Sequence, residues 1–96
     1  MERSAAKIAQ AGTVESMDCR VTITQSDGPM TIEVAGSGAS RFRGAMEAKV
    51  RDVLSGLGVS PDSGLRVDVQ DNGALDLVLG ARVESAYLRF TGGPAS

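Results

Sequence analysis

The sequence predicts an α+β fold, in which a four-stranded sheet built from two β-hairpins carries one long helix packed on one face. Two pairs of segments show the alternating apolar residues of β-strands, and turn-forming residues join the members of each pair. Between the pairs lies a longer segment whose apolar residues recur with the helical period. The predicted order is therefore ββαββ, with room for a short helix at the carboxyl end.

The first predicted hairpin consists of strands over residues 19–25 and 30–35. Val21 and Ile23 alternate with β-branched threonines, which suit a pleated strand. The segment 26–29, Ser-Asp-Gly-Pro, has the composition of a turn, and alternation resumes after it. These features indicate two antiparallel neighbours.

A helix is predicted over residues 41–57, after a flexible connection of Gly and Ser residues at 36–39. Ser40 is a candidate for its amino-terminal cap, and Gly58 for its stop. The apolar residues that define its buried face are Phe42, Ala45, Met46, Val50, Val53, Leu54 and Leu57.

The second predicted hairpin pairs strands over 65–70 and 75–80, because Asn72-Gly73 between them is typical of a tight turn. The alternation continues past residue 80, but Ala81 to Phe90 also fits a final helix. The change from strand to helix is placed near Gly80. The predicted core comprises Val21, Ile23, Ile32, Val34, Phe42, Met46, Val50, Val53, Leu54, Leu65, Val67, Leu75, Leu77 and Leu79.

The 96 residues suit one domain, with residues 1–10 and 91–96 expected to be flexible. A net charge of −2 argues against binding to nucleic acid or to anionic membranes. The chain has no histidine and one cysteine, which excludes cysteine–histidine catalysis and multi-cysteine zinc sites. Without a long apolar run or a secretory signal, a cytoplasmic protein with protein partners is expected.

Ser16 is the candidate functional residue, since it lies between Glu15 and Asp18 just before the first predicted strand. Serine is a poor nucleophile without a base, and the chain offers no histidine for that role. Ser16 therefore fits the substrate of another enzyme better than a catalyst. The alternative is an ordinary turn serine, with Glu15 and Asp18 serving solvation.

Other groups of residues suggest sites less strongly. The basic residues Arg41, Arg43, Lys49 and Arg51 follow the glycine-containing loop, where a helix start could bind phosphate, but a solvated face explains them better. Turn formation and solubility explain Asp68, Asp71 and Asp76 better than a metal site. Cys19 is expected to be a buried, passive thiol.

Gly12, Thr13, Glu15, Ser16 and Asp18 form a Gly-Thr-x-Glu-Ser-x-Asp pattern. With the stretches 71–76, Asp-Asn-Gly-Ala-Leu-Asp, and 81–86, Ala-Arg-Val-Glu-Ser-Ala, this pattern resembles the acyl carrier (gamma) chain family of citrate lyase. The resemblance implies a non-catalytic carrier. It implies that Ser16 is joined by a phosphodiester to a prosthetic group derived from 2'-(5''-triphosphoribosyl)-3'-dephospho-coenzyme A, whose thiol carries acetyl and citryl groups.

The implied partners are the alpha (acyltransferase) and beta (lyase) subunits of citrate lyase and a prosthetic-group transferase. The chain departs from the family pattern at Asn72, Leu77 and Gly80, where lysine, cysteine and arginine are usual. A carrier of citramalate lyase or malonate decarboxylase remains an alternative, although the latter typically has a Gly-Ser-Gly-Asp attachment pattern. A small non-covalent interaction domain is the alternative from another class.

Overall fold

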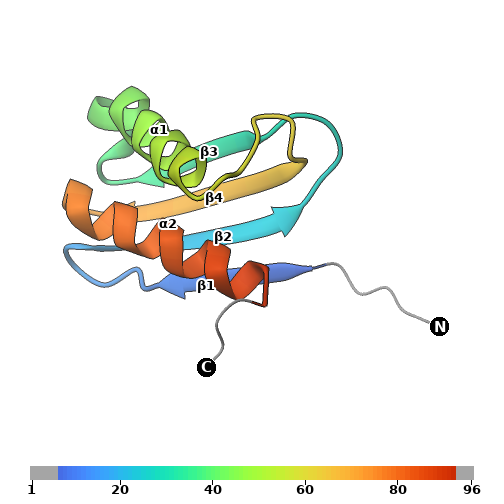
Figure 1. The fold of residues 1–96 in the computed structure, drawn as a ribbon. Coiled ribbons are helices and arrows are strands. Elements are labelled where there is room, and N and C mark those ends of the chain that lie inside the picture. Colours follow the sequence, from blue (N-terminus) through green and yellow to red (C-terminus); the bar gives the residue numbers. More distant parts are fainter. Residues whose placement is uncertain (1–6, 93–96) are drawn as a thin grey trace.

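The structure, a computed structural model, describes residues 7–92. Its order is βββαβα: strands β1 (Ile8–Gly12), β2 (Asp18–Gln25) and β3 (Thr31–Gly36), helix α1 (Ala39–Gly56), strand β4 (Leu65–Asn72) and helix α2 (Asp76–Phe90). The strands form one sheet in the order β1-β2-β4-β3, and both helices cover the same face (Figure 1). The predicted α+β class and four-stranded sheet are confirmed, but the predicted order ββαββ is wrong.

Both predicted hairpins are absent from the sheet. β4 lies between β2 and β3, antiparallel to β2 and parallel to β3. The chain passes from β3 to β4 through α1, as it must, because parallel neighbours need a crossover connection rather than a tight turn. The segment 26–30 therefore links two strands that are not neighbours.

The second predicted hairpin is replaced by β4 followed directly by α2. Leu75 and Leu77, predicted as inward residues of a strand, are exposed. Leu79, Val83, Ala86 and Phe90 instead form a buried stripe at helical spacing. The alternative of a final helix over 81–90 is thus confirmed, but the helix begins at Asp76 rather than near Gly80. The segment forms a helix rather than a strand because the helix buries this continuous apolar face.

β1 is a strand that the sequence pattern does not reveal. Its residues Ile-Ala-Gln-Ala-Gly include few of the β-branched and aromatic types enriched in strands. Pairing with β2 along its whole length holds it, and the Arg89 guanidinium of α2 donates a hydrogen bond of 2.7 Å to the Gln10 carbonyl. Residues 8–10 thus lie in the sheet, whereas most of the amino-terminal segment expected to be flexible, and 93–96, lie outside the described residues.

α1 is close to the predicted helix, but its ends are built differently. Ser40 lies within the helix and does not cap it, since the cap position is Gly38. At the other end the predicted stop is confirmed: Gly58 has a φ of +86°, and Val59 donates its N–H to the Leu54 carbonyl at 2.9 Å. This is the Schellman arrangement, which satisfies carbonyl groups that the helix leaves without partners.

The core lies between the helices and the sheet. Most predicted core residues are buried, Val53 is half-buried, and Phe42, Leu75 and Leu77 are exposed, so these three predictions are wrong. The apolar residues buried in addition are Ala11, Cys19, Met30, Ala39, Val59, Val69, Val83, Ala86 and Phe90. Across residues 7–92, neither helix is long and apolar enough to cross a membrane.

Candidate functional site

Ser16 lies in the connection between β1 and β2, at one end of the sheet (Figure 1). Its side chain is exposed to solvent. The chain reverses here with two residues in the left-handed region, Gly12 at φ +91° and Met17 at φ +65°. Such a conformation is uncommon for a residue other than glycine, and the surroundings must hold Met17 in it.

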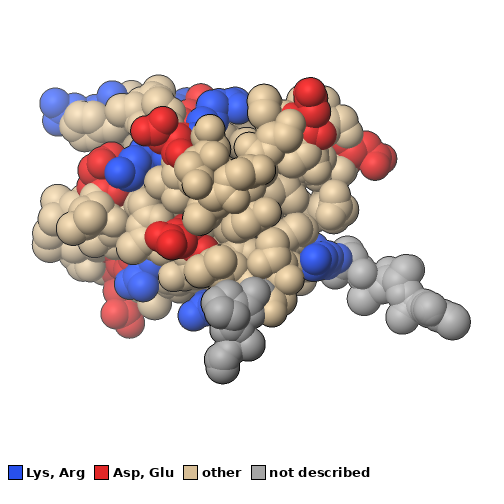
Figure 2. Space-filling view, in the orientation of Figure 1, with Lys and Arg blue, Asp and Glu red and all other residues tan. Residues whose placement is uncertain are grey.

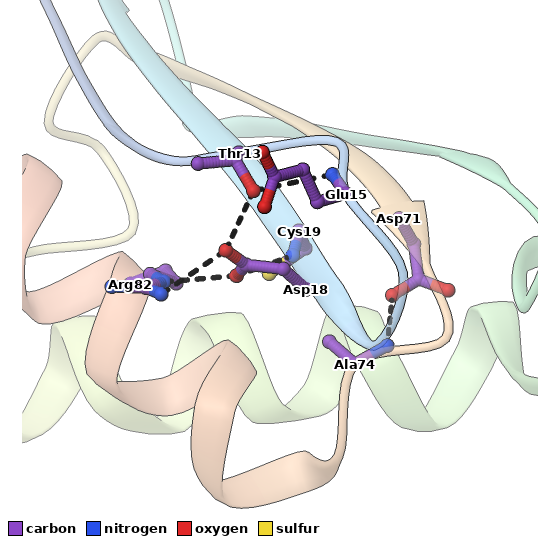
Figure 3. Close-up of polar contacts among 7 residues, drawn as sticks. All are labelled: Thr13, Glu15, Asp18, Cys19, Asp71, Ala74 and Arg82. Atoms are coloured by element: carbon purple, nitrogen blue, oxygen red, sulfur yellow. Dashed lines mark hydrogen bonds and ion pairs between the residues drawn. The ribbon is translucent and has the colours of Figure 1, made fainter.

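The connection is braced from within by Thr13 and Asp18. The Thr13 hydroxyl donates to Asp18 Oδ2 at 2.8 Å and accepts the Glu15 N–H at 3.1 Å (Figure 3). The Asp18 N–H in turn donates to the Glu15 carbonyl at 3.1 Å. Three residues of the sequence pattern therefore serve the shape of the turn that displays Ser16.

Arg82 of α2 holds the same turn from outside. Its Nε and Nη2 atoms donate to the two oxygens of Asp18 at 3.0 and 3.1 Å, and the Cys19 N–H donates to Asp18 Oδ1 at 2.7 Å (Figure 3). Bonds from Arg82, Cys19 and Thr13 stabilise the ionised carboxyl and lower its pKa to about 2. Asp18 is thus a charged anchor that fixes the turn to the helix.

A third set of contacts comes from the end of β4. The Met17 N–H donates to the Asn72 carbonyl at 2.7 Å, and the Asn72 side-chain amide donates to the Val14 carbonyl at 2.9 Å. These bonds hold the backbone on both sides of Ser16. Ser16 is consequently held at a defined place with its side chain exposed.

Asp71 organises the neighbouring loops. It is 4 % exposed and accepts backbone N–H bonds from Gly38 at 3.0 Å, Gly73 at 3.1 Å and Ala74 at 3.0 Å. A Cβ atom at Gly38 would lie 2.7 Å from its Oδ2, so the glycine allows the close approach. The glycine-containing loop before α1 is thereby explained by packing.

The three aspartates considered for a metal site do not come together. Asp71 is bonded to backbone amides, Asp68 pairs with Arg66 at 3.0 Å, and Asp76 pairs with Lys49 at 3.1 Å. Within residues 7–92 no group of three acidic, cysteine or histidine side chains is arranged to hold a metal ion. Each aspartate has a structural partner instead.

Cys19 is buried, as predicted. Burial, followed by the charges of Asp18 and Asp71, raises the pKa of its thiol to about 11. Since the thiolate is the reactive form, this thiol is inert at neutral pH. Cys19 belongs to the core beneath the turn rather than to a reactive site.

A groove of about 440 Å³ lies beside the Ser16 turn, between the first turns of α1 and α2. Its lining includes Arg41 and Phe42 on α1, Asp71 and Gly73 at the end of β4, and Leu79 on α2. A Cβ atom at Gly73 would lie 3.8 Å from Met17 Cα, so the groove and the turn are adjacent. The structure thus combines an exposed serine, a rigid turn and a neighbouring hollow, without a histidine to activate the hydroxyl.

Comparisons with known proteins identify the family of this chain. The citrate lyase acyl carrier protein of Haemophilus influenzae (strain PittEE) is 45 % identical over 85 residues, which are 88 % of this chain and 85 % of that protein. The chain belongs to the citrate lyase acyl carrier protein family. The carrier of the same name from Pectobacterium atrosepticum is 39 % identical over 87 residues, 91 % of this chain and 88 % of that protein.

Residues 6–90 also match the ACP family described as malonate decarboxylase delta subunit (MdcD). A solved structure from Thermus thermophilus shares the fold, with a TM-score of 0.53 and 14 % identity. The match covers 86 % of this chain but 15 % of that much longer one. For this member of the citrate lyase acyl carrier protein family, that likeness concerns the fold alone.

The sequence alone does not predict that Arg82 and Asn72 hold the serine turn, or that Asp71 organises the loops beside it. Arg82 lies in the stretch 81–86, and the other two lie in 71–76, which are the stretches that carry the resemblance to the acyl carrier family. The place of these residues in the two stretches is the sequence signal for their importance. Contacts over 58 and 64 positions of sequence cannot be read without the topology.

Proposed function

We propose that this chain is the acyl carrier subunit of citrate lyase and that Ser16 is the attachment site of its prosthetic group. The observation that supports the proposal is the presentation of Ser16. Its exposed hydroxyl lies on a turn that Thr13, Asp18 and Arg82 fix in place. An ordinary surface serine needs no such framework.

The charges around Ser16 favour a prosthetic arm that extends away from the turn. An arm that carries phosphates is repelled by nearby carboxylates, and the sequence places Glu15 and Asp18 beside the attachment point. The ion pair with Arg82 offsets the charge of Asp18, so the repulsion is smaller than the sequence suggests. The Ser16 side chain is also open to solvent, which leaves room for the arm.

The attachment step that we propose uses the Ser16 hydroxyl as the acceptor. Its Oγ forms a bond to the innermost phosphorus of the triphosphoribosyl donor, pyrophosphate leaves, and the hydroxyl proton passes to a base of the transferase. The product is a phosphodiester. When bound, the group supplies the thiol that carries acetyl and citryl units between active sites, and its tether keeps their local concentration in the range of about millimolar.

This chain then acts as a non-catalytic part of a complex with the alpha and beta subunits. The test is to coexpress it with the prosthetic-group transferase and to assemble the complex from wild type, Ser16→Ala and Ser37→Ala. Ser37 is a matched control, because it is also an exposed loop serine at this end of the molecule. We expect Ser16→Ala alone to lose both the mass increase and citrate cleavage.

A carrier for malonate decarboxylase is the second candidate, favoured by the family description that matches residues 6–90. The loaded chain should then support malonate decarboxylation with the decarboxylase subunits, and should fail to support citrate cleavage with the lyase subunits. Turnover of citrate by the complex, with none of malonate, decides for citrate lyase. A chain that gains no mass with either transferase is a non-covalent interaction domain.

A further inference from the structure

Large apolar side chains that face solvent are concentrated at one end of the molecule. Residues 7–92 include six of them, and five surround the Ser16 end: Val14, Met17, Phe42, Leu75 and Leu77. Single exposed apolar residues are normal on protein surfaces, but a cluster marks a contact site. We call these five residues the serine-end surface.

The connections among the elements place these residues close to Ser16. Val14 and Met17 flank it in the chain, and both backbones are bonded to Asn72 at the end of β4. Leu75 follows three residues later, and Leu77 lies on the first turn of α2 with 80 % of its surface exposed. Phe42 lines the groove that Gly73 borders beside Met17.

The overall views agree with this placement. Figure 1 shows the β1–β2 connection and the beginnings of α1 and α2 at the same end of the sheet. In Figure 2 the surface at that end includes an uncharged region between charged side chains above and below it. The sixth exposed residue, Ile8, lies at the other end of β1 from the connection and is 59 % exposed.

Among the proposed partners, the enzyme that attaches the prosthetic group must contact the protein closest to Ser16. A carrier's acyl-exchanging partners are reached through the prosthetic arm, whose length separates their active sites from the carrier's surface. The transferase has no such arm, because the Ser16 Oγ itself must enter its active site. It must therefore cover the turn and the residues next to it.

We infer that the serine-end surface is the docking surface for the prosthetic-group transferase, which contacts it through an apolar rim around its active site. The inference rests on the proposed attachment at Ser16. A few residues near the centre of an interface carry most of its binding free energy. Leu75 and Leu77 lie outside the turn, at the beginning of α2, so they can be changed without touching it.

The experiment compares wild type with the double variant Leu75→Ser/Leu77→Ser and with Ile8→Ser. Serine suits the Leu75 position, because that residue is the amino-terminal cap of α2, and Leu77 is almost fully exposed. Circular dichroism and thermal unfolding check that the fold is kept. The rate of mass gain is measured at several carrier concentrations with saturating donor, which gives kcat/KM for the carrier.

We expect kcat/KM of the double variant to fall about tenfold or more, chiefly through a higher KM, and that of Ile8→Ser to match wild type. Ser16→Ala, which cannot react, should bind the transferase, and the same protein with both leucines replaced should bind about tenfold more weakly. If wild type is modified at Ser16 and the double variant reacts equally well, the docking inference is wrong while the proposed function stands. If wild type is not modified at Ser16, the proposed function fails first.

Discussion

Asp18 links the turn that carries Ser16 to helix α2. Its carboxylate accepts bonds from the Thr13 hydroxyl, the Cys19 N–H and the Arg82 guanidinium. Only 15 % of its side-chain surface is exposed. A carboxylate that accepts several charge-assisted hydrogen bonds is held more firmly than one in an isolated surface ion pair. An isolated surface ion pair adds little to the stability of a protein. Protonation of Asp18 should therefore weaken the link between the turn and α2.

The pH dependence of stability tests the role of Asp18. Its pKa in the folded protein is about 2, below its ordinary value of 3.8, so folding favours the ionised form. The stabilisation is complete above the ordinary value and is lost as the pH falls towards 2. We expect the unfolding free energy of wild type to fall more steeply over this interval than that of Asp18→Asn. Equal slopes for the two proteins would show that the carboxylate makes no such contribution.

At the scale of elements, one glycine of α1 and one glycine of β3 can be compared. Gly44 lies inside the helix with no neighbour within 4 Å of an added Cβ, whereas a Cβ at Gly36 would lie against the Asp71 carbonyl. Alanine is favoured over glycine in a helix interior by about 0.5–1 kcal/mol. We expect Gly44→Ala to gain about that amount in denaturant unfolding.

The matched variant Gly36→Ala should be strongly destabilised, because Gly36 also has a φ of +111°. A stable Gly36→Ala protein would mean that β3 and β4 are not packed as closely as described. The comparison therefore probes the register that brings the end of β3 beside Asp71.

The elements differ in how far their sequences determine them. α1 is predicted almost to its ends, because its long apolar stripe and Gly58 are local signals. The leucines at 75, 77 and 79 fit a strand as well as a helix, and the burial of Val83, Ala86 and Phe90 against the sheet decides for α2. β1 has weak strand residues, and the pairing of β4 with β2 and β3 depends on contacts distant in sequence. The proposal for Ser16 rests on a local pattern, which is why the sequence alone can suggest it.

At the scale of the whole molecule, one two-layer core carries the site. Leu54 of α1 is completely buried in that core, whereas Leu77 on α2 is 80 % exposed. Replacing a buried leucine by alanine costs about 2–5 kcal/mol, and exposed positions change stability by about 0.5 kcal/mol or less. We expect Leu54→Ala to lose that larger amount in urea unfolding and Leu77→Ala to remain near wild type. A small loss for Leu54→Ala would contradict the packing of α1 on the sheet.

If Ser16 is the attachment site as proposed, the residues that stabilise the fold are distinct from the residue that carries the function. The core holds the sheet and helices, and the turn at one end presents a hydroxyl that takes no part in packing. Replacement of Ser16 should therefore leave the unfolding free energy within about 0.5 kcal/mol of wild type while removing the attachment point.

The most direct test is to map the prosthetic group on the coexpressed protein by fragmentation mass spectrometry. We expect the entire mass increase on the peptide that contains Ser16, at Ser16 itself, and no increase in Ser16→Ala. Attachment at Ser4, Ser26, Ser37 or Ser40, or an unmodified Ser16 in a complex that cleaves citrate, would contradict the account.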